Sequence, residues 1–280
     1  MNFSLYSGLP KIPDYQRLLQ SELFKSMEGF SGGFLQSQSE HLKAYRGKWV
    51  ADPLHQWSRQ WEYPFVFAKI AEYQQNAGPQ SELRILDAGS GVTFFPYYLA
   101  SCFNHSLVSC CDYDYSLGNA YSRLNGCLPG RVQFVPGDLR SLPFQNKVFD
   151  IVYCVSVLEH TDAYSTIISE FRRVLKQGGM LVVTFDISVD GEADIPPEKA
   201  EELLEILYQH FPHSKKVAYA NLKGKVHEQD LVTTHFIRKM NPSLLPWKYP
   251  LLTAMKSIAK LRLPRTLYRN LTFYCQSFDY

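Results

Sequence analysis

The sequence predicts an α/β protein built on a mostly parallel sheet, and two observations carry that prediction. Short apolar runs alternate with stretches of helical periodicity along the middle of the chain, which is the pattern of β–α–β units with right-handed crossovers. The first of these runs, residues 83–86, leads into the segment Asp87-Ala88-Gly89-Ser90-Gly91. An acid followed by two glycines one residue apart is typical of a tight turn after a buried strand, where the backbone approaches a ligand closely.

Further strands follow the glycine turn in order. An apolar run at 107–111 ends in Asp112, about twenty residues beyond Gly91, where an acid at the end of a second strand can accept ribose hydroxyls. A helical pattern over 164–176 stops at Gly178-Gly179, a glycine signal for a helix C-terminus. The other apolar runs predict strands at 132–135, 149–156, 180–185 and, after a long insert, 271–275.

Helices are predicted on both sides of this run of strands. Before it, 14–28 has a helical pattern that Ser31-Gly32-Gly33 breaks, and 34–45 forms a second short helix. Residues 57–74 form another helix, which is dense in aromatic side chains at its start. After the fifth strand, three more helices are predicted at 197–210, 230–240 and 249–261.

Charge limits the partners that the chain is expected to bind. With 29 basic and 27 acidic residues its net charge is +2, which argues against bulk affinity for nucleic acid. The stretch 231–278 nevertheless has no Asp or Glu and eight basic residues: Arg238, Lys239, Lys248, Lys256, Lys260, Arg262, Arg265 and Arg269. This basic C-terminal third either faces RNA, an acidic substrate or an anionic surface, or is an ordinary solvated face.

Cysteine spacing and hydropathy limit the compartment. The six cysteines show no metal-ligand spacing, so no metal site is predicted. Free thiols fit a reducing compartment, and a cytoplasmic location is expected. No apolar stretch reaches the length of a membrane span, and the first residues lack the basic start of a signal peptide.

The residues after the glycine turn exclude two kinds of nucleotide site. A phosphate-binding loop needs Lys followed directly by Ser or Thr, and no such pair follows here. Where a dinucleotide fingerprint has its third glycine, the chain has Phe94. The turn therefore indicates a nucleoside ligand without a phosphate cradle.

From 83 to 186 the chain resembles class I S-adenosylmethionine-dependent methyltransferases. The matching pieces are 85–91, Asp112, 137–139, 149–152, 157–160 and 173–179. One departure is Thr93, which stands where many members of the superfamily have a third glycine. The resemblance implies a Rossmann-like, mostly parallel seven-stranded sheet with helices on both faces. It also implies an N-terminal helical cap and a helical insert before an antiparallel last strand beside the fifth.

The same resemblance divides the chain into two parts. Residues 1–81 are expected to be an N-terminal helical cap and cofactor lid. Residues 82–280 are expected to be the methyltransferase domain, in which 186–270 contains a substrate-side helical insert.

Cofactor contacts are implied residue by residue. The backbone of Ala88, Gly89, Ser90 and Gly91 lines the amino-acid portion of S-adenosylmethionine, and Asp87 belongs to this set or only holds loop amides. Asp112 accepts from both ribose hydroxyls, with Asp114 as the alternative. The remaining implied contacts are Tyr113 over the adenine ring, Asp138 at its amino group, the Leu139 amide at the ring, and Val155 and Ser156 under the sulfonium.

The aromatic stretch before the first strand has two interpretations. Trp61 can lie over the cofactor mouth, where a sulfonium gains from cation–π attraction, or these rings can dock a helix onto the sheet. The segment Trp61-Glu62-Tyr63-Pro64-Phe65 also resembles guanidinoacetate methyltransferase, which implies that Glu62 faces a cationic amine or guanidine acceptor. That family has an acid where this chain has Val155, which weighs against a guanidino acceptor.

Methyl transfer from a sulfonium is an in-line displacement, so a base is needed only where the acceptor must lose a proton. His160 is the first candidate, because it follows the fourth strand and its ordinary pKa suits neutral pH. Glu159 and Glu62 come next, and His227 and His235 in the insert are further candidates. A polar residue at such a junction can also be purely structural.

The predicted function is S-adenosylmethionine-dependent methyl transfer to an oxygen or nitrogen atom of a small-molecule acceptor, a metabolite or natural-product intermediate. Two alternatives stay open at this point. One is an RNA or protein methyltransferase that uses the basic C-terminal third, although nucleic acid is not the expected partner. The other is a non-catalytic cofactor-binding subunit, and an oligomer is compatible with either.

Overall fold

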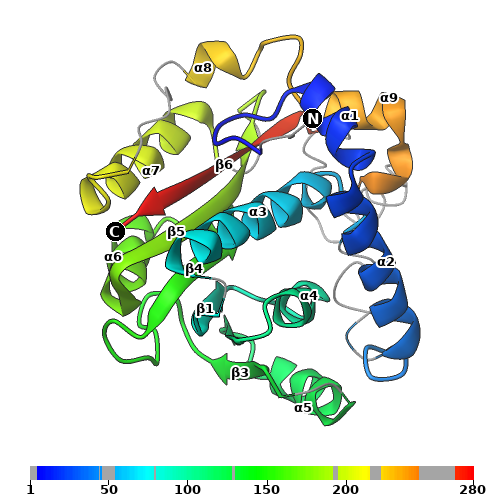
Figure 1. The fold of residues 1–280 in the computed structure, drawn as a ribbon. Helices are drawn as coiled ribbons and strands as arrows, with labels where there is room; N and C mark the ends of the chain where they lie inside the picture. Colours follow the sequence, from blue (N-terminus) through cyan, green and yellow to red (C-terminus); the bar gives the residue numbers. More distant parts are fainter. Residues whose placement is uncertain are drawn as a thin grey trace, which may run out of the picture.

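The computed structural model describes residues 5–43, 45, 54–78, 80–127, 130–191, 195–214, 222–245 and 269–280. In this part of the chain a six-stranded sheet lies at the centre, in the order β3-β2-β1-β4-β5-β6 (Figure 1). Neighbouring strands run parallel except β5 and β6, which are antiparallel. The strands are β1 (Leu83–Ala88), β2 (Ser106–Asp112), β3 (Val132–Pro136), β4 (Phe149–Val155), β5 (Leu175–Ser188) and β6 (Leu271–Asp279).

This sheet confirms the predicted fold class and corrects its strand count. The parallel β–α–β order is present, and so is the antiparallel last strand beside the fifth. The resemblance implied seven strands, whereas the described residues form six. The described residues between β5 and β6 form helices, and β6 pairs with β5. The six apolar runs in the sequence correspond to the six strands of the described residues.

Helices cover both faces of the sheet because alternate strand residues point to opposite sides. Ile85 belongs to one apolar core, which α1 to α5 and α9 share, and Leu86 belongs to a second core with α6, α7 and α8 (Figure 1). The helices are α1 (Ile12–Leu19), α2 (Glu22–Ser37), α3 (Arg59–Ala77), α4 (Phe95–Cys102), α5 (Leu117–Cys127), α6 (Tyr164–Val174), α7 (Pro197–His210), α8 (Leu222–Lys225) and α9 (Thr234–Met240), with single 3₁₀ turns η1 (Leu158–His160) and η2 (Pro242–Leu244).

The break between the first two helices lies earlier than predicted. Ser21 caps α2, because its hydroxyl accepts the Phe24 N–H at 3.2 Å. The helix then continues through Gly32 and Gly33, and residues 34–37, predicted to open a second helix, belong to α2. A glycine inside a helix costs about 0.5–1 kcal/mol. Burial of the apolar face of α2 against the core outweighs that cost.

The predicted helix stop at Gly178-Gly179 lies inside strand β5. Helix α6 ends at Val174, and β5 begins at once at Leu175. Gly178 has a φ of +75° and donates its N–H to the carbonyl of Tyr280 at 2.7 Å. The glycine pair therefore allows an irregular turn within the strand instead of ending the helix.

The insert after β5 is helical where it is described. The helix predicted at 197–210 is α7, whereas only 234–240 of the helix predicted at 230–240 is formed. The helix predicted at 249–261 lies outside the described residues. Among the described helices, none combines the length and the apolar character that crossing a bilayer requires.

Candidate functional site

The turn after β1 has the backbone that its glycines predict. Gly89 and Gly91 have φ values of +80° and +50°, in the left-handed region that favours glycine. The N–H groups of Gly89 and Ser90 donate to the carbonyl of Cys111 at 2.8 and 3.1 Å, so the turn crosses over the end of β2. A Cβ atom on Gly89 would lie 2.5 Å from Cγ2 of Val157. The loop after β4 therefore packs directly against this turn.

Asp112, at the end of β2, ties the glycine turn to the following loop. One carboxylate oxygen accepts the Gly91 N–H at 3.0 Å, and the other accepts the Asp114 N–H at 3.0 Å. Asp114 instead accepts the N–H of Ser116 at 2.9 Å. Of the two acids weighed for the ribose, only Asp112 has a hydrogen bond to the glycine turn. Tyr113 beside it is 79% exposed, which leaves its ring free to move over a ligand.

A narrow cleft opens between the glycine turn, the end of β4 and the start of α3. Its volume is about 40 Å³, which is room for a few water molecules, so the side chains over it must move aside to admit a nucleoside. Several predicted cofactor residues line this cleft together: Asp87, Gly89, Ser90, Gly91, Val155 and Ser156. The lining residues that the sequence had not singled out are Tyr45, Gln56, Arg59, Tyr63 and Tyr153.

A buried polar network spans the cleft from α3 to the end of β4. Arg59 donates through Nη1 to Oε2 of Glu62 and, at 2.5 Å, to Oγ of Ser156. Ser156 in turn donates to Oε1 of Glu62 at 2.8 Å. The Glu62 side chain is fully buried and that of Arg59 is 12% exposed. Both Glu62 oxygens are therefore occupied by residues of the chain, and contact with a cationic acceptor stays a prediction.

The charges in this network depend on one another. Burial is the largest single effect and lowers the pKa of Arg59, but the charges of Glu62, Tyr63, Asp186 and Glu159 together raise it by more. The net shift is therefore upward, and the guanidinium stays charged. A buried charge that lost its partner would be strongly destabilising. The Arg59–Glu62 pair therefore holds the start of α3 against the β4 end of the sheet.

Asp87 is the acid on the other side of the cleft. It is 5% exposed, and the pKa of its carboxyl is raised to about 7. Burial is the largest cause. A hydrogen bond with the Tyr153 hydroxyl lowers the pKa in part, and the charge of Asp112 raises it. A carboxyl with such a pKa changes charge near neutral pH. It can therefore respond to a cation that enters the cleft.

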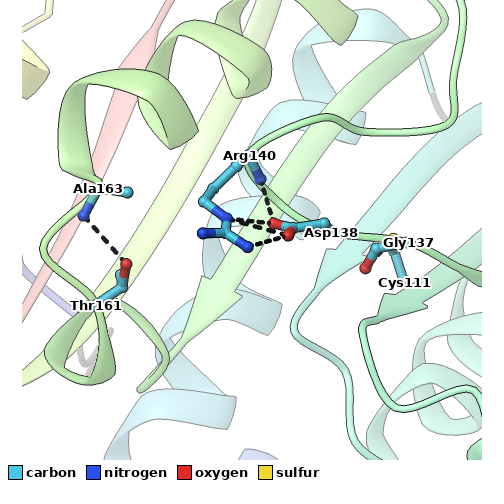
Figure 2. A network of polar contacts seen from close by, with 6 residues as sticks. All are labelled: Cys111, Gly137, Asp138, Arg140, Thr161 and Ala163. Atoms are coloured by element: carbon cyan, nitrogen blue, oxygen red, sulfur yellow. Dashed lines mark hydrogen bonds and ion pairs between the residues drawn. The ribbon is translucent and has the colours of Figure 1, made fainter.

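Asp138 and Leu139 follow β3, at a distance from this network along the sheet edge. Figure 2 shows the Arg140 guanidinium turned back onto the Asp138 carboxylate, with Nε at 3.0 Å from both oxygens. This hydrogen bonding holds the pKa of Asp138 below its usual value. Asp138 is therefore ionised and partly exposed, as an acceptor for an amino group must be. Leu139 packs against the second core.

Trp61, Glu159 and His160 are among the predicted residues that do not line the cleft. Trp61 is fully buried and makes an edge contact with Tyr6 at a ring-centroid distance of 5.8 Å, which matches the interpretation that these aromatics dock α3. His160 is exposed in η1. Together with Glu159 it lines a second hollow of about 220 Å³, next to the Asp162–Lys199 ion pair.

The described part of the insert contributes no residue to the lining of the cleft. His227 and His235 line a third hollow of about 330 Å³ near the start of β6. Of the eight basic residues in the C-terminal third, only Arg238, Lys239 and Arg269 belong to the described part of the chain. The other five lie outside the described residues.

The cleft matches the chemistry of a nucleoside that carries an amino-acid tail. Gly89 lets Val157 pack directly against the turn that lines the cleft, and Asp112 has further acceptor capacity beyond its two amide contacts. Among the described residues, one acidic residue, Asp87, and one basic residue, Arg59, line the cleft. S-adenosylmethionine has ribose hydroxyls, an ammonium and a carboxylate, so these residues fit it.

Comparison with known proteins agrees with this interpretation. Residues 86–183 match a family described as a methyltransferase domain. The sterol 24-C-methyltransferase of Eremothecium gossypii is 32% identical over 180 residues, which are 62% of this chain and 47% of that protein. The corresponding enzyme of Schizosaccharomyces pombe is 30% identical over 197 residues, or 64% of this chain and 47% of that protein. The chain thus spans about half the length of these curated relatives.

The fold also agrees with a solved structure over nearly the whole chain. The cyclase SpnF covers 98% of this chain, and 98% of SpnF is covered in return, with a TM-score of 0.50 and 20% sequence identity. At that identity the likeness supports the fold, including the N-terminal helices and the last strand, and leaves the reaction open.

Proposed function

Because the chain belongs to the class I S-adenosylmethionine-dependent methyltransferase superfamily, we propose that it transfers the methyl group of S-adenosylmethionine to a small-molecule acceptor. The observation that carries the proposal is the glycine turn after β1. Its left-handed backbone lies between Val157 on one side and Asp112 on the other and lines the cleft. Asp112 offers an acceptor for hydroxyl groups at this turn, as a ligand with a ribose and no phosphate requires.

The acceptor enters from the carboxyl edge of the sheet, beside the loop after β4. The hollow lined by Glu159 and His160 lies along this loop, which supports a role for either residue in taking a proton from the acceptor. His160 is the better candidate, because its imidazole is exposed at the hollow, where an acceptor can contact it. Most of the rate enhancement would come from positioning and desolvation.

The acceptor atom has two candidates. The sequence predicts oxygen or nitrogen. The names of the curated relatives, sterol 24-C-methyltransferases, favour carbon as the second candidate. Methylation of a carbon–carbon double bond forms a cation that must lose a proton, so this candidate also needs a base near the acceptor. A carbon acceptor, like an oxygen or nitrogen acceptor that must lose a proton, therefore requires a base, and Glu159 and His160 in this hollow are the candidates.

The test is binding followed by turnover. S-adenosylhomocysteine is titrated into the purified chain by calorimetry, and methyl-labelled S-adenosylmethionine is then incubated with amines, phenols and sterols in turn. We expect binding, and label in one acceptor class. No binding would refute the proposal. Binding without turnover on any acceptor would favour the non-catalytic cofactor-binding subunit. Label transferred only to RNA or protein would favour the macromolecular alternative.

A further inference from the structure

We propose that Arg59 binds the carboxylate at the methionine end of the cofactor and that Glu62 and Ser156 position it for this contact. The inference rests on the proposed function, because it concerns the same cleft. It adds a cofactor residue from the cap helix α3 to those contributed by the sheet. It also assigns a task to a buried charge that the sequence had not singled out.

The position of Arg59 is the first argument. Its side chain comes from the first residue of α3 and lines the cleft together with the glycine turn after β1. Under the proposed function that turn faces the amino-acid portion of the ligand, and Val157 packs against its backbone at Gly89. Arg59 is the one basic residue among those that line the cleft within the described chain.

The geometry of the guanidinium is the second argument. Within the described chain, its hydrogen bonds to Ser58, Glu62 and Ser156 are all made through Nη1. An arginine has five N–H donors in a planar fork that matches a carboxylate. Donors on Nε and Nη2 therefore remain for a ligand, while Nη1 keeps the side chain fixed. The guanidinium is preorganised, so binding orders no additional side chain.

Charge complementarity is the third argument. A zwitterionic amino acid presents one ammonium and one carboxylate, and the cleft presents one acid, Asp87, and one base, Arg59. Arg59 would repel the ammonium or a cationic acceptor in so poorly hydrated a site. The positions of Asp87 and Arg59 thus set the orientation of the amino-acid end of the cofactor, with its carboxylate toward Arg59 on α3.

Ser156 links this contact to the reacting end of the cofactor. It has a φ of +49°, an uncommon value for a residue with a side chain, and its N–H donates to the Thr184 carbonyl at 3.0 Å. The bonds from Ser156 to Glu62 and Arg59 hold it in that conformation. A carboxylate on Arg59 would therefore also fix the loop after β4, beside which the methyl acceptor is expected to enter.

The test compares two ligands that differ in the amino-acid end. S-adenosylhomocysteine has the ammonium and the carboxylate, whereas 5′-methylthioadenosine lacks both, and each has a neutral sulfur. We expect Arg59→Met to weaken S-adenosylhomocysteine binding about tenfold or more and to change methylthioadenosine binding less than about twofold. Asp112→Ala is the matched control, because it should weaken both ligands alike. Equal losses for both ligands in Arg59→Met, or no loss for either, would overturn the inference.

A second variant guards against misfolding. Arg59→Met leaves Glu62 buried without its partner, so Arg59→Met/Glu62→Gln, which removes both charges, is measured beside it after each fold is checked by circular dichroism. Both variants should lose the same preference for S-adenosylhomocysteine. If the unmodified chain binds neither ligand, the proposed function itself fails. If it binds both and only the Arg59 effect is missing, the inference alone fails.

Discussion

The Asp112 carboxylate accepts the Gly91 N–H at 3.0 Å, which joins the end of β2 to the glycine turn after β1. Because its other oxygen accepts the Asp114 N–H, the carboxylate is fixed at the edge of the glycine turn. A fixed acid binds ribose hydroxyls without losing further side-chain freedom. Asp112 is therefore the residue whose removal should affect cofactor binding most directly.

The first prediction is that Asp112→Ala weakens S-adenosylhomocysteine binding at least about tenfold, the scale of a hydrogen bond to a charged group. Calorimetry measures the change. Asp114→Ala is the control, because Asp114 bonds to Ser116 and not to the glycine turn. A larger loss in Asp114→Ala than in Asp112→Ala would reverse the ribose assignment.

The second prediction concerns Gly89. Alanine at a φ of +80°, with Cβ 2.5 Å from Val157, should lower the free energy of unfolding by about 1–3 kcal/mol. Chemical denaturation measures it. Adding Val157→Ala should restore part of the lost free energy of unfolding, because it removes the clash with the new Cβ. The strain of alanine at a positive φ should remain.

Gly32→Ala provides the matched comparison for Gly89→Ala. Gly32 lies inside α2, and no atom lies within 4 Å of a Cβ built there. Its replacement should raise stability by about 0.5–1 kcal/mol. If both substitutions change the free energy of unfolding alike, neither the positive φ of Gly89 nor its contact with Val157 constrains the glycine turn.

The sheet could be predicted from the sequence because its signals are local. The six apolar runs, the glycine turn and the acid at position 112 each arise within a few residues, and the strand pairing follows from the order of β–α–β units. Gly91 and Asp112 meet because the carboxyl ends of parallel strands share one edge of the sheet. The seventh strand had no such local signal and came only from the superfamily.

The cap side of the site could not be predicted in the same way. Tyr45 accepts the Val92 N–H at 2.8 Å across 47 positions of sequence, and no local pattern determines such a contact. Arg59 offered one signal, a charge three residues before Glu62 in an aromatic stretch, which suits an ion pair on one helix face. The aromatic residues dominate this stretch of sequence, and the Arg59–Glu62 ion pair is seen only in the structure.

The third prediction follows from the Asp87 carboxyl, whose pKa burial raises to about 7. An unfolded chain would release this proton near pH 4. The folded form therefore loses stability as the pH rises from about 4 to 7, and the penalty is fully present above 7, on the order of 4 kcal/mol. Asp87→Asn should accordingly raise the melting temperature of the ligand-free chain at pH 8 and change it little at pH 4.

Cofactor affinity should show the opposite dependence on pH. The ammonium of S-adenosylhomocysteine favours the ionised carboxylate, so binding should strengthen between pH 6 and 8 and lose this dependence in Asp87→Asn. Calorimetry across that range measures it. A pH profile that is the same in both forms would mean that Asp87 does not meet the ammonium.

The fourth prediction separates the adenine contact from the rest of the site. Asp138 is ionised and held by Arg140, so it can accept from the adenine amino group but not from the carbonyl that replaces it in S-inosylhomocysteine. The unmodified chain should therefore prefer S-adenosylhomocysteine, and Asp138→Ala should bind the two ligands with similar affinity. Competition binding of both ligands measures the preference.

Arg140→Ala is the matched variant, because it removes the guanidinium and leaves the carboxylate. It should keep the preference for adenine, and it should strengthen it if Arg140 competes with the adenine for the same oxygens. Loss of the preference in Arg140→Ala would mean that the arginine, and not Asp138, contacts the base. The adenine position would then lie nearer the Arg140 side chain, whose guanidinium Figure 2 shows turned back onto Asp138.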